Sequence, residues 1–285
     1  AEKKGNNVVV SGDNFTVKVD NGAVTSYVVD GEELLRAPMA PNYFRALTDN
    51  DIDFLNFVSP FLFVHPYYKW KRATKAVRAL KTTIEEKDNT VKVKVALDVQ
   101  FMKNAYVSYT VYPDGKLAVY HSAVPKAALL RFGFQWNVDK SLTQISWYGR
   151  GEAPSYPDRK TGYKIGKYSL PIDKFEYTYM RPQESSTRAD VRYFTLTDKK
   201  GSGIKVTAYY DKPVLFCALP YTPFMLDKYE HVTDIDRTHD ITVNVDSSQY
   251  GIGGDMPGQA FVRDKYQVKA GEKQALSFLV EPYKK

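Results

Sequence analysis

The chain has 285 residues, of which 43% are hydrophobic and 14% aromatic, enough to bury a core as one large unit or two smaller domains. Its formal charge is +7, but the lysines are dispersed and alternate with apolar residues, which is typical of a solvated sheet face and argues against a nucleic-acid partner. No apolar run approaches the roughly 20 residues that span a membrane, so we expect no membrane partner. The single Cys217 excludes an internal disulfide and a cysteine-based metal site.

Period-two alternation recurs along the chain and predicts strands separated by polar turns. In chain order, the predicted strands are 8–10, 15–19, 24–29, 91–99, 106–112, 117–122, 191–196, 204–210, 241–245 and 274–280. Helical periodicity is scarce, since no segment of about 12 residues carries an apolar stripe with caps. Many strands at short spacing predict an all-β fold, a large antiparallel sandwich of two sheets, in one domain over residues 1–285.

One long stretch, Asp53–Pro66, lacks strand alternation. It is apolar and aromatic and contains Pro60 and Pro66. Long loops without secondary structure are usually functional, so this stretch predicts a mobile functional loop.

Four further segments depart from strand patterning. They are Arg45 to Ile52, Trp147 to Arg159, Met180 to Glu184, and Tyr250 to Asp255. In the first, three consecutive acid or amide side chains either hold a turn or ligate a hard cation such as Na⁺ or Ca²⁺. In the second, Asp158 and Arg159 can form a hydrogen-bonded charge pair. In the fourth, three glycines within four positions allow another backbone, or a sugar, to approach closely.

The order and spacing of these segments resemble the C-terminal domain, or small chain, of family 2 β-galactosidases. The pattern is Arg-Ala-x-Thr-Asp-Asn-Asp, then Tyr-Gly-x-Gly-x-x-x-x-Tyr-x-Asp-Arg, then Pro-x-Glu, then Gly-Ile-Gly-Gly-Asp, and the resemblance runs from about Val10 to Tyr283. It implies a galactose mutarotase-like β-supersandwich. It also implies a larger polypeptide, in which this domain packs beside a catalytic (β/α)₈ barrel and closes one wall of its active site.

The resemblance implies two sets of site residues. The substrate-binding positions are Asp53, Phe54, Asn56, Asp255, Met256 and Gly258. The structural motif positions are Arg45, Asp49, Asn50, Asp51, Tyr148, Gly149, Gly151, Asp158, Arg159, Glu184, Gly253 and Gly254.

This sequence departs from the family pattern at several places. The family usually has Gly where Asp53 stands, so the hinge of the loop lacks its usual glycine here. A Trp that forms an apolar platform for sugar usually follows Gly-Gly-Asp, whereas this chain continues Met256-Pro257-Gly258. Either another aromatic residue from 54–68 replaces that ring, or the substrate preference differs. Pro154 and Ser185-Ser186 replace a usual Glu and a usual Asn-Gly.

We expect no catalytic residue in this chain. A retaining glycosidase needs two carboxyl groups about 5 to 5.5 Å apart. The candidates by residue type are Glu152, Glu184, Asp49, Asp51 and Asp255. The resemblance places both catalytic glutamates in the barrel, and no alternating βα pattern here predicts a barrel. Aldose 1-epimerase chemistry needs a His and a Glu over the sugar ring, and no mutarotase motif surrounds any of the four histidines.

The resemblance therefore implies an accessory domain of a β-galactosidase that hydrolyses terminal β-linked galactosides, contributing a wall and a mobile loop. An independent carbohydrate-binding module, a mutarotase-like protein and a purely structural domain are the alternatives. The partners would be the catalytic barrel of the same polypeptide and a carbohydrate substrate. We expect no metal or other cofactor here, although the parent family commonly uses Mg²⁺ and Na⁺. Because residues Ala1–Asn7 are polar and hold no apolar run, we expect no signal peptide there. A bacterial parent is expected, and the cytoplasm and the periplasm are both open as its compartment.

Overall fold

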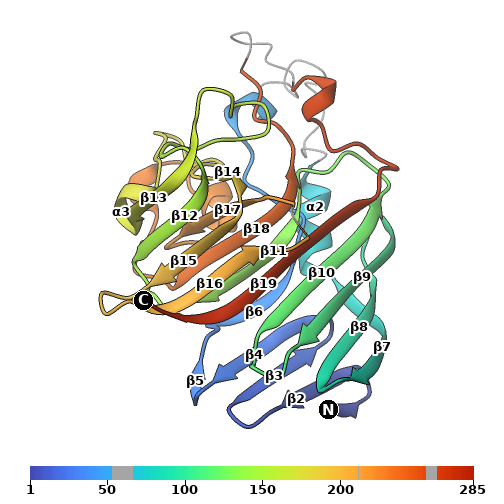
Figure 1. Cartoon of the computed structure of the whole chain (residues 1–285). Coiled ribbons are helices and arrows are strands. Elements are labelled where there is room, and N and C mark those ends of the chain that lie inside the picture. The colour runs from blue at the N-terminus through green and yellow to red at the C-terminus, as the bar shows by residue number, and fades with distance from the viewer. Residues whose placement is uncertain (53–66, 211, 255–261) are drawn as a thin grey trace.

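Two antiparallel β-sheets pack face to face and form a sandwich (Figure 1). The computed structural model describes residues 1–52, 67–210, 212–254 and 262–285. The predicted all-β sandwich is confirmed.

The first sheet has ten strands, nine of them in one hydrogen-bonded path. In spatial order they are β1 (Glu2–Lys4), β2 (Asn7–Ser11), β3 (Phe15–Asp20), β4 (Ala23–Val29), β6 (Ala37–Asn42), β11 (Arg131–Val138), β18 (Ile241–Gln249), β17 (Val214–Leu219) and β14 (Arg188–Val191), with β5 (Glu32–Glu33) beside β4.

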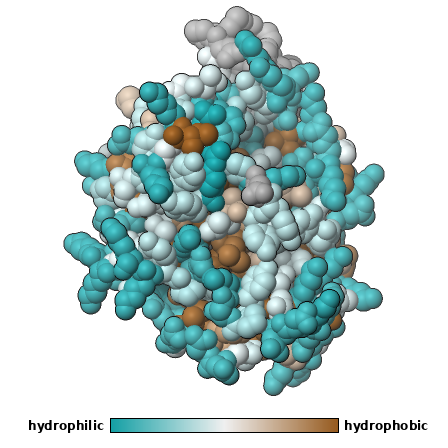
Figure 2. Space-filling view, viewed as in Figure 1, coloured by the Kyte–Doolittle hydropathy of each residue, from teal (hydrophilic) through white to brown (hydrophobic). Residues whose placement is uncertain are grey.

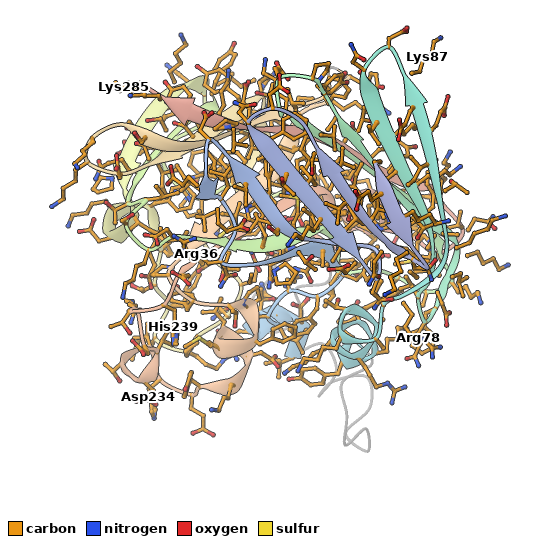
Figure 3. The ribbon with its side chains drawn as sticks, turned by 90° about the horizontal axis from the view of Figure 1, so that it is seen from below. Arg36, Arg78, Lys87, Asp234, His239 and Lys285 are labelled. Atoms are coloured by element: carbon orange, nitrogen blue, oxygen red, sulfur yellow. The ribbon has the colours of Figure 1, made fainter. Side chains whose placement is uncertain are left out.

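The second sheet has nine strands. In spatial order they are β13 (Ile165–Pro171), β12 (Gln144–Arg150), β15 (Tyr193–Thr197), β16 (Ser202–Ala208), β19 (Gln274–Lys284), β10 (Leu117–Pro125), β9 (Met102–Val111), β8 (Thr90–Asp98) and β7 (Arg78–Lys87). Figure 3 shows the sandwich from below, with Arg78 and Lys87 at opposite ends of β7.

The core lies between the sheets, where alternate side chains of facing strands interdigitate. Trp136 of β11 stacks on Phe278 of β19, with ring centroids 5.8 Å apart. His121 of β10 stacks on Phe132 of β11 at 4.4 Å, and it is fully buried. Because each pair joins one sheet to the other, these rings fix the face-to-face packing.

Two expectations about elements were wrong. The predicted strand 191–196 is divided, because Val191 ends β14 in the first sheet whereas Tyr193 begins β15 in the second. The chain crosses between sheets there, and period two alone carries no signal of a crossing. The helix α2 (Tyr68–Lys75) was not predicted, since it buries only Trp70 and Ala73. The other helices are short: α3 (Ile172–Phe175), α4 (Pro223–Lys228), η1 (Val232–Asp234) and η2 (Asp264–Tyr266).

Candidate functional site

The four sequence motifs converge at one end of the sandwich, at the top of Figure 1. The residues that join them through side-chain contacts are here named the motif cluster. They are Arg45, Asp49, Asn50, Asp51, Tyr156, Asp158, Arg181, Gln183, Glu184, Gly251, Ile252, Gly253 and Gly254.

A buried ion pair ties the first motif to the fourth. The Nη1 of Arg45 lies 2.8 Å from Oδ2 of Asp51, and both side chains are almost fully buried. The same Asp51 oxygen accepts a hydrogen bond from the backbone N–H of Thr48, and Nη2 of Arg45 donates to the carbonyl oxygen of Gly251 at 3.2 Å. A buried ion pair requires such additional hydrogen bonds to offset its desolvation. This pair therefore fixes the helical turn at 49–52 against the Gly-rich segment.

The two ends that lead into 53–66 and 255–261 are held next to each other. The Nδ2 of Asn50 donates to the carbonyl oxygen of Ile252 at 2.7 Å. A Cβ added at Gly254 would lie 3.5 Å from the same Nδ2. Asn50 is two residues before Ile52, and Gly254 is the last described residue before 255. Both segments thus begin at neighbouring points of one hydrogen-bonded base.

The second motif supports the Gly-rich segment through Asp158. Its Oδ2 accepts a 2.8 Å hydrogen bond from the N–H of Gly253. A Cβ at Gly251 would lie only 2.5 Å from that same oxygen, so only glycine permits this approach. Asp158 therefore binds the fourth motif. The expected charge pair with Arg159 does not form among the described residues, and the guanidinium of Arg159 instead lies over the Tyr156 ring, 5.5 Å from its centroid.

The third motif supports the first through Asp49. The Nε2 of Gln183 donates to Oδ2 of Asp49 at 2.7 Å, while Oε1 of Gln183 accepts from the Asp49 backbone N–H at 3.1 Å. The Nε of Arg181 forms an ion pair with the other oxygen of Asp49. Asp49, Asn50 and Asp51 therefore face three different sets of protein partners. These contacts are those of a turn held by side-chain hydrogen bonds.

A buried charged layer lies beneath the motif cluster, around Glu184. Its Oε1 accepts from the hydroxyl of Thr187 at 2.9 Å and lies 3.6 Å from Nη2 of Arg131. The same guanidinium lies 3.1 Å from Oδ2 of Asp246. The guanidinium of Arg131 thus lies next to two buried carboxylates, those of Glu184 and Asp246. Burial and the nearby Glu184 raise the pKa of Asp246 to about 7, and the attraction of Arg131 only partly opposes this shift.

Three further motif residues, Tyr148, Gly149 and Gly151, lie outside the cluster. Tyr148 and Gly149 lie on β12, and Gly151 follows it. A Cβ at Gly149 would lie 2.9 Å from the Cα of Val191, so this glycine allows β12 and β14 of different sheets to approach closely. The expected substrate-binding residues Asp53, Phe54, Asn56, Asp255, Met256 and Gly258 lie outside the described residues.

The described carboxylates of the motif cluster are all engaged by cations, amides or hydroxyls. Two side chains of the charged layer, Arg131 and Asp246, were missed by the sequence analysis. Arg131 carries a signal, a charge between the apolar Leu130 and Phe132, whereas Asp246 is followed by the polar Ser247 and gives no such signal.

The described residues contain no group of three or more His, Cys, Asp or Glu side chains that could hold a metal ion. Asp234 and His239, which Figure 3 labels, lie on the surface connection between α4 and β18. None of the described helices is long and apolar enough to cross a membrane.

The sandwich is similar to that of a galactose mutarotase-like protein from Lactobacillus casei ATCC 334. The TM-score is 0.51 at 12% sequence identity, and the match covers 97% of this chain and 99% of that one. The fold is thus of the galactose mutarotase-like class. A sequence model of the β-galactosidase small chain matches residues 11–280, and the chain belongs to this family.

Its relatives include much longer proteins. The β-galactosidase of Priestia megaterium (strain DSM 319 / IMG 1521) is 31% identical over 283 residues, covering 96% of this chain and 26% of the relative. The β-galactosidase of Lactobacillus delbrueckii subsp. bulgaricus is 31% identical over 284 residues, covering 97% of this chain and 27% of the relative. That of Streptococcus thermophilus is 28% identical over 283 residues, also covering 97% and 27%. The chain spans about a quarter of the length of these relatives.

Proposed function

We propose that this chain is an accessory domain of a β-galactosidase, and that residues 53–66 and 255–261 form part of the wall of its active site. The observation that carries the proposal is the contact between Asn50 and Ile252, which sets the starts of the two segments side by side. The proposed activity rests on the relatives, which are named β-galactosidases.

The contribution of the domain to catalysis is indirect under this proposal. The motif cluster is a rigid base, because the Arg45–Asp51 ion pair is buried and Asp158 is hydrogen-bonded to the Gly-rich segment. A rigid base fixes where the two segments enter the active site and so limits the entropy lost when they contact the sugar. The bond-breaking carboxylates, and any Mg²⁺ or Na⁺, belong to a catalytic barrel elsewhere in a longer polypeptide.

The test uses that longer polypeptide and a chromogenic β-galactoside. Replacing residues 53–66 by a Gly-Ser linker of the same length should raise KM about tenfold and change kcat much less, as expected when only substrate binding is lost. The matched control replaces the β15–β16 turn, residues 198–201, and should leave both constants unchanged. Unchanged KM in the first variant would mean that the domain has only a structural role.

A second assay addresses the absence of catalysis. The purified 285-residue chain should not hydrolyse the same galactoside, whereas turnover by this chain alone would contradict the proposal.

A further inference from the structure

The outer face of the second sheet carries two adjoining pockets, and the second of them also reaches Val214 of β17 and Ser247 of β18 in the first sheet. One has a volume of about 290 Å³ and the other of about 440 Å³. They share Tyr120, Tyr209, Tyr210 and Ser277. Figure 2 looks onto this face and shows mostly pale side chains in its middle and strongly hydrophilic ones toward its margins. The joint depression is here named the tyrosine trough.

Strand alternation builds the floor of the tyrosine trough. Lys94 of β8, Ser108 of β9, Tyr120 of β10 and Ser277 of β19 are successive cross-strand partners. All four point away from the core, because their neighbours along each strand are buried in it. Ser108 and Ser277 are small, so each leaves a hollow beside the larger Tyr120 that stands between them.

Two tyrosine pairs form the walls. The Tyr106 and Tyr120 rings lie 5.7 Å apart, and the hydroxyls of Tyr112 and Tyr209 lie 3.0 Å apart. Burial and the Tyr120 hydroxyl raise the pKa of Tyr106 to about 12. The hydrogen bond to Tyr209, together with burial, raises the pKa of Tyr112 to about 12. These phenols are therefore neutral at ordinary pH and can both donate and accept hydrogen bonds.

The floor also contains an unpartnered polar group. Ser108 is 5% exposed and lines the first pocket, and its Oγ has no hydrogen-bond partner among the described residues. A buried hydroxyl without a partner costs about 1–3 kcal/mol.

Among the described residues, the charged side chains that line the tyrosine trough are all positive. Its described lining residues include Lys92, Lys94, Lys212 and Lys273 and no Asp or Glu. The Nζ of Lys94 lies 4.5 Å from the centroid of the Tyr106 ring, which holds a positive charge at the edge of the pocket. Asp211 lies outside the described residues.

We propose that the tyrosine trough binds an oligosaccharide that carries carboxylate or sulfate groups. Tyrosine rings stack on the apolar C–H faces of sugar rings, and their hydroxyls hydrogen-bond to sugar hydroxyls. The lysines attract the acidic groups, which gives the site its preference over neutral saccharides. Concave sites of a few hundred Å³ are of the size that small ligands fill. The residues are separate from the motif cluster, so this binding does not depend on the proposed β-galactosidase role.

Calorimetry with tri-galacturonate as the acidic probe and maltotriose as the neutral one tests this proposal. The 285-residue chain and the longer polypeptide should both bind tri-galacturonate, at least about tenfold more tightly than maltotriose, and more weakly as salt increases. The double variant Lys94→Gln/Lys212→Gln should weaken binding about fivefold or more, and the matched control Lys87→Gln should not. Lys87, labelled in Figure 3, is exposed at the end of β7.

A second test compares alanine variants of two exposed tyrosines, one in the trough and one outside it. Tyr210 is 72% exposed and Tyr177 is 49% exposed, so alanine at either position spares the core. Tyr210→Ala should weaken tri-galacturonate binding and Tyr177→Ala should not. The proposal is overturned by absent binding at millimolar probe, by equal affinity for maltotriose, or by equal effects of test and control variants. Binding by the 285-residue chain but not by the longer polypeptide also overturns it, since another domain would then cover the trough.

Discussion

The side-chain amide of Asn50 donates a 2.7 Å hydrogen bond to the carbonyl oxygen of Ile252, across 202 residues of sequence. Each residue lies within three positions of a segment to which we assign a substrate-facing role. The contact therefore couples the starting points of both segments. Its loss should affect substrate binding more than the stability of the domain.

The Asn50→Ala variant of the longer polypeptide tests this coupling. Because Asn50 is only half-buried, the loss of one hydrogen bond should lower the free energy of unfolding by about 1 kcal/mol. KM for a chromogenic galactoside should rise severalfold, because the two segments no longer start from fixed points. The exposed Asn7→Ala is the matched control. A rise in KM that Asn7→Ala reproduces would remove the support for this coupling.

The buried ion pair of Arg45 and Asp51 should dominate the stability of the motif cluster. Arg45→Met leaves Asp51 buried without its cation and should lower the free energy of unfolding by about 3–5 kcal/mol, measured by urea denaturation. Arg36, which pairs with Asp139 at the surface, provides the control, and Arg36→Met should cost less than about 1 kcal/mol. Similar costs for both variants would show that the cluster is not a rigid base.

His121 should make the protein less stable in acid. Burial lowers the pKa of His121 to about 4, below its ordinary value of 6.5, and its ring stays neutral between Tyr43 and the carbonyl of Tyr106. Between pH 6.5 and 4 the unfolded chain binds the proton and the folded chain does not. The stability from this group is therefore lost as pH falls through that window, by up to about 3 kcal/mol. The stability difference between wild type and His121→Gln should narrow as pH falls from 7 to 4. A constant difference would contradict this assignment.

Asp246 should have the opposite effect. Its pKa is raised from 3.8 to about 7, so between these values the folded chain binds a proton that the unfolded chain does not. Its contribution to stability therefore decreases as pH rises from about 4 to 7, with a slope of up to about 1.4 kcal/mol per pH unit. Asp246→Asn removes this slope, so the variant should gain stability relative to wild type as pH rises. Urea denaturation at a series of pH values measures both effects, and parallel curves would show that Asp246 is ionised in the fold throughout.

Local patterning predicted the strands well where one face is buried. Lys92 and Lys94 alternate with buried valines, and β8 has the inward and outward faces that this pattern requires. The order of strands is not a local property. β19, at the end of the chain, lies between β16 and β10, and no periodicity indicates that position. The eight residues of α2 bury too few side chains to give a helical signal.

The motifs were predictable as a set, but their contacts were not. The resemblance brought Asp49 and the Pro-x-Glu segment into one pattern, yet nothing in the sequence pairs Asp49 with Gln183 at a separation of 134 residues. Asp158 was expected to bind its neighbour Arg159 and binds Gly253 instead. The neighbouring residue was therefore the wrong partner to expect. Gly251 has no side chain, so the Asp158 carboxylate can approach the fourth motif closely, and a Cβ there would exclude it.

Hydrogen–deuterium exchange of the longer polypeptide, with and without a galactose-derived inhibitor, addresses the central claim most directly. If the domain forms part of the wall, the inhibitor should slow exchange in peptides that cover 49–56 and 250–258, while the β2–β3 hairpin, residues 7–20, should exchange at an unchanged rate. Identical exchange of all three regions, at inhibitor concentrations that abolish turnover, would contradict the account.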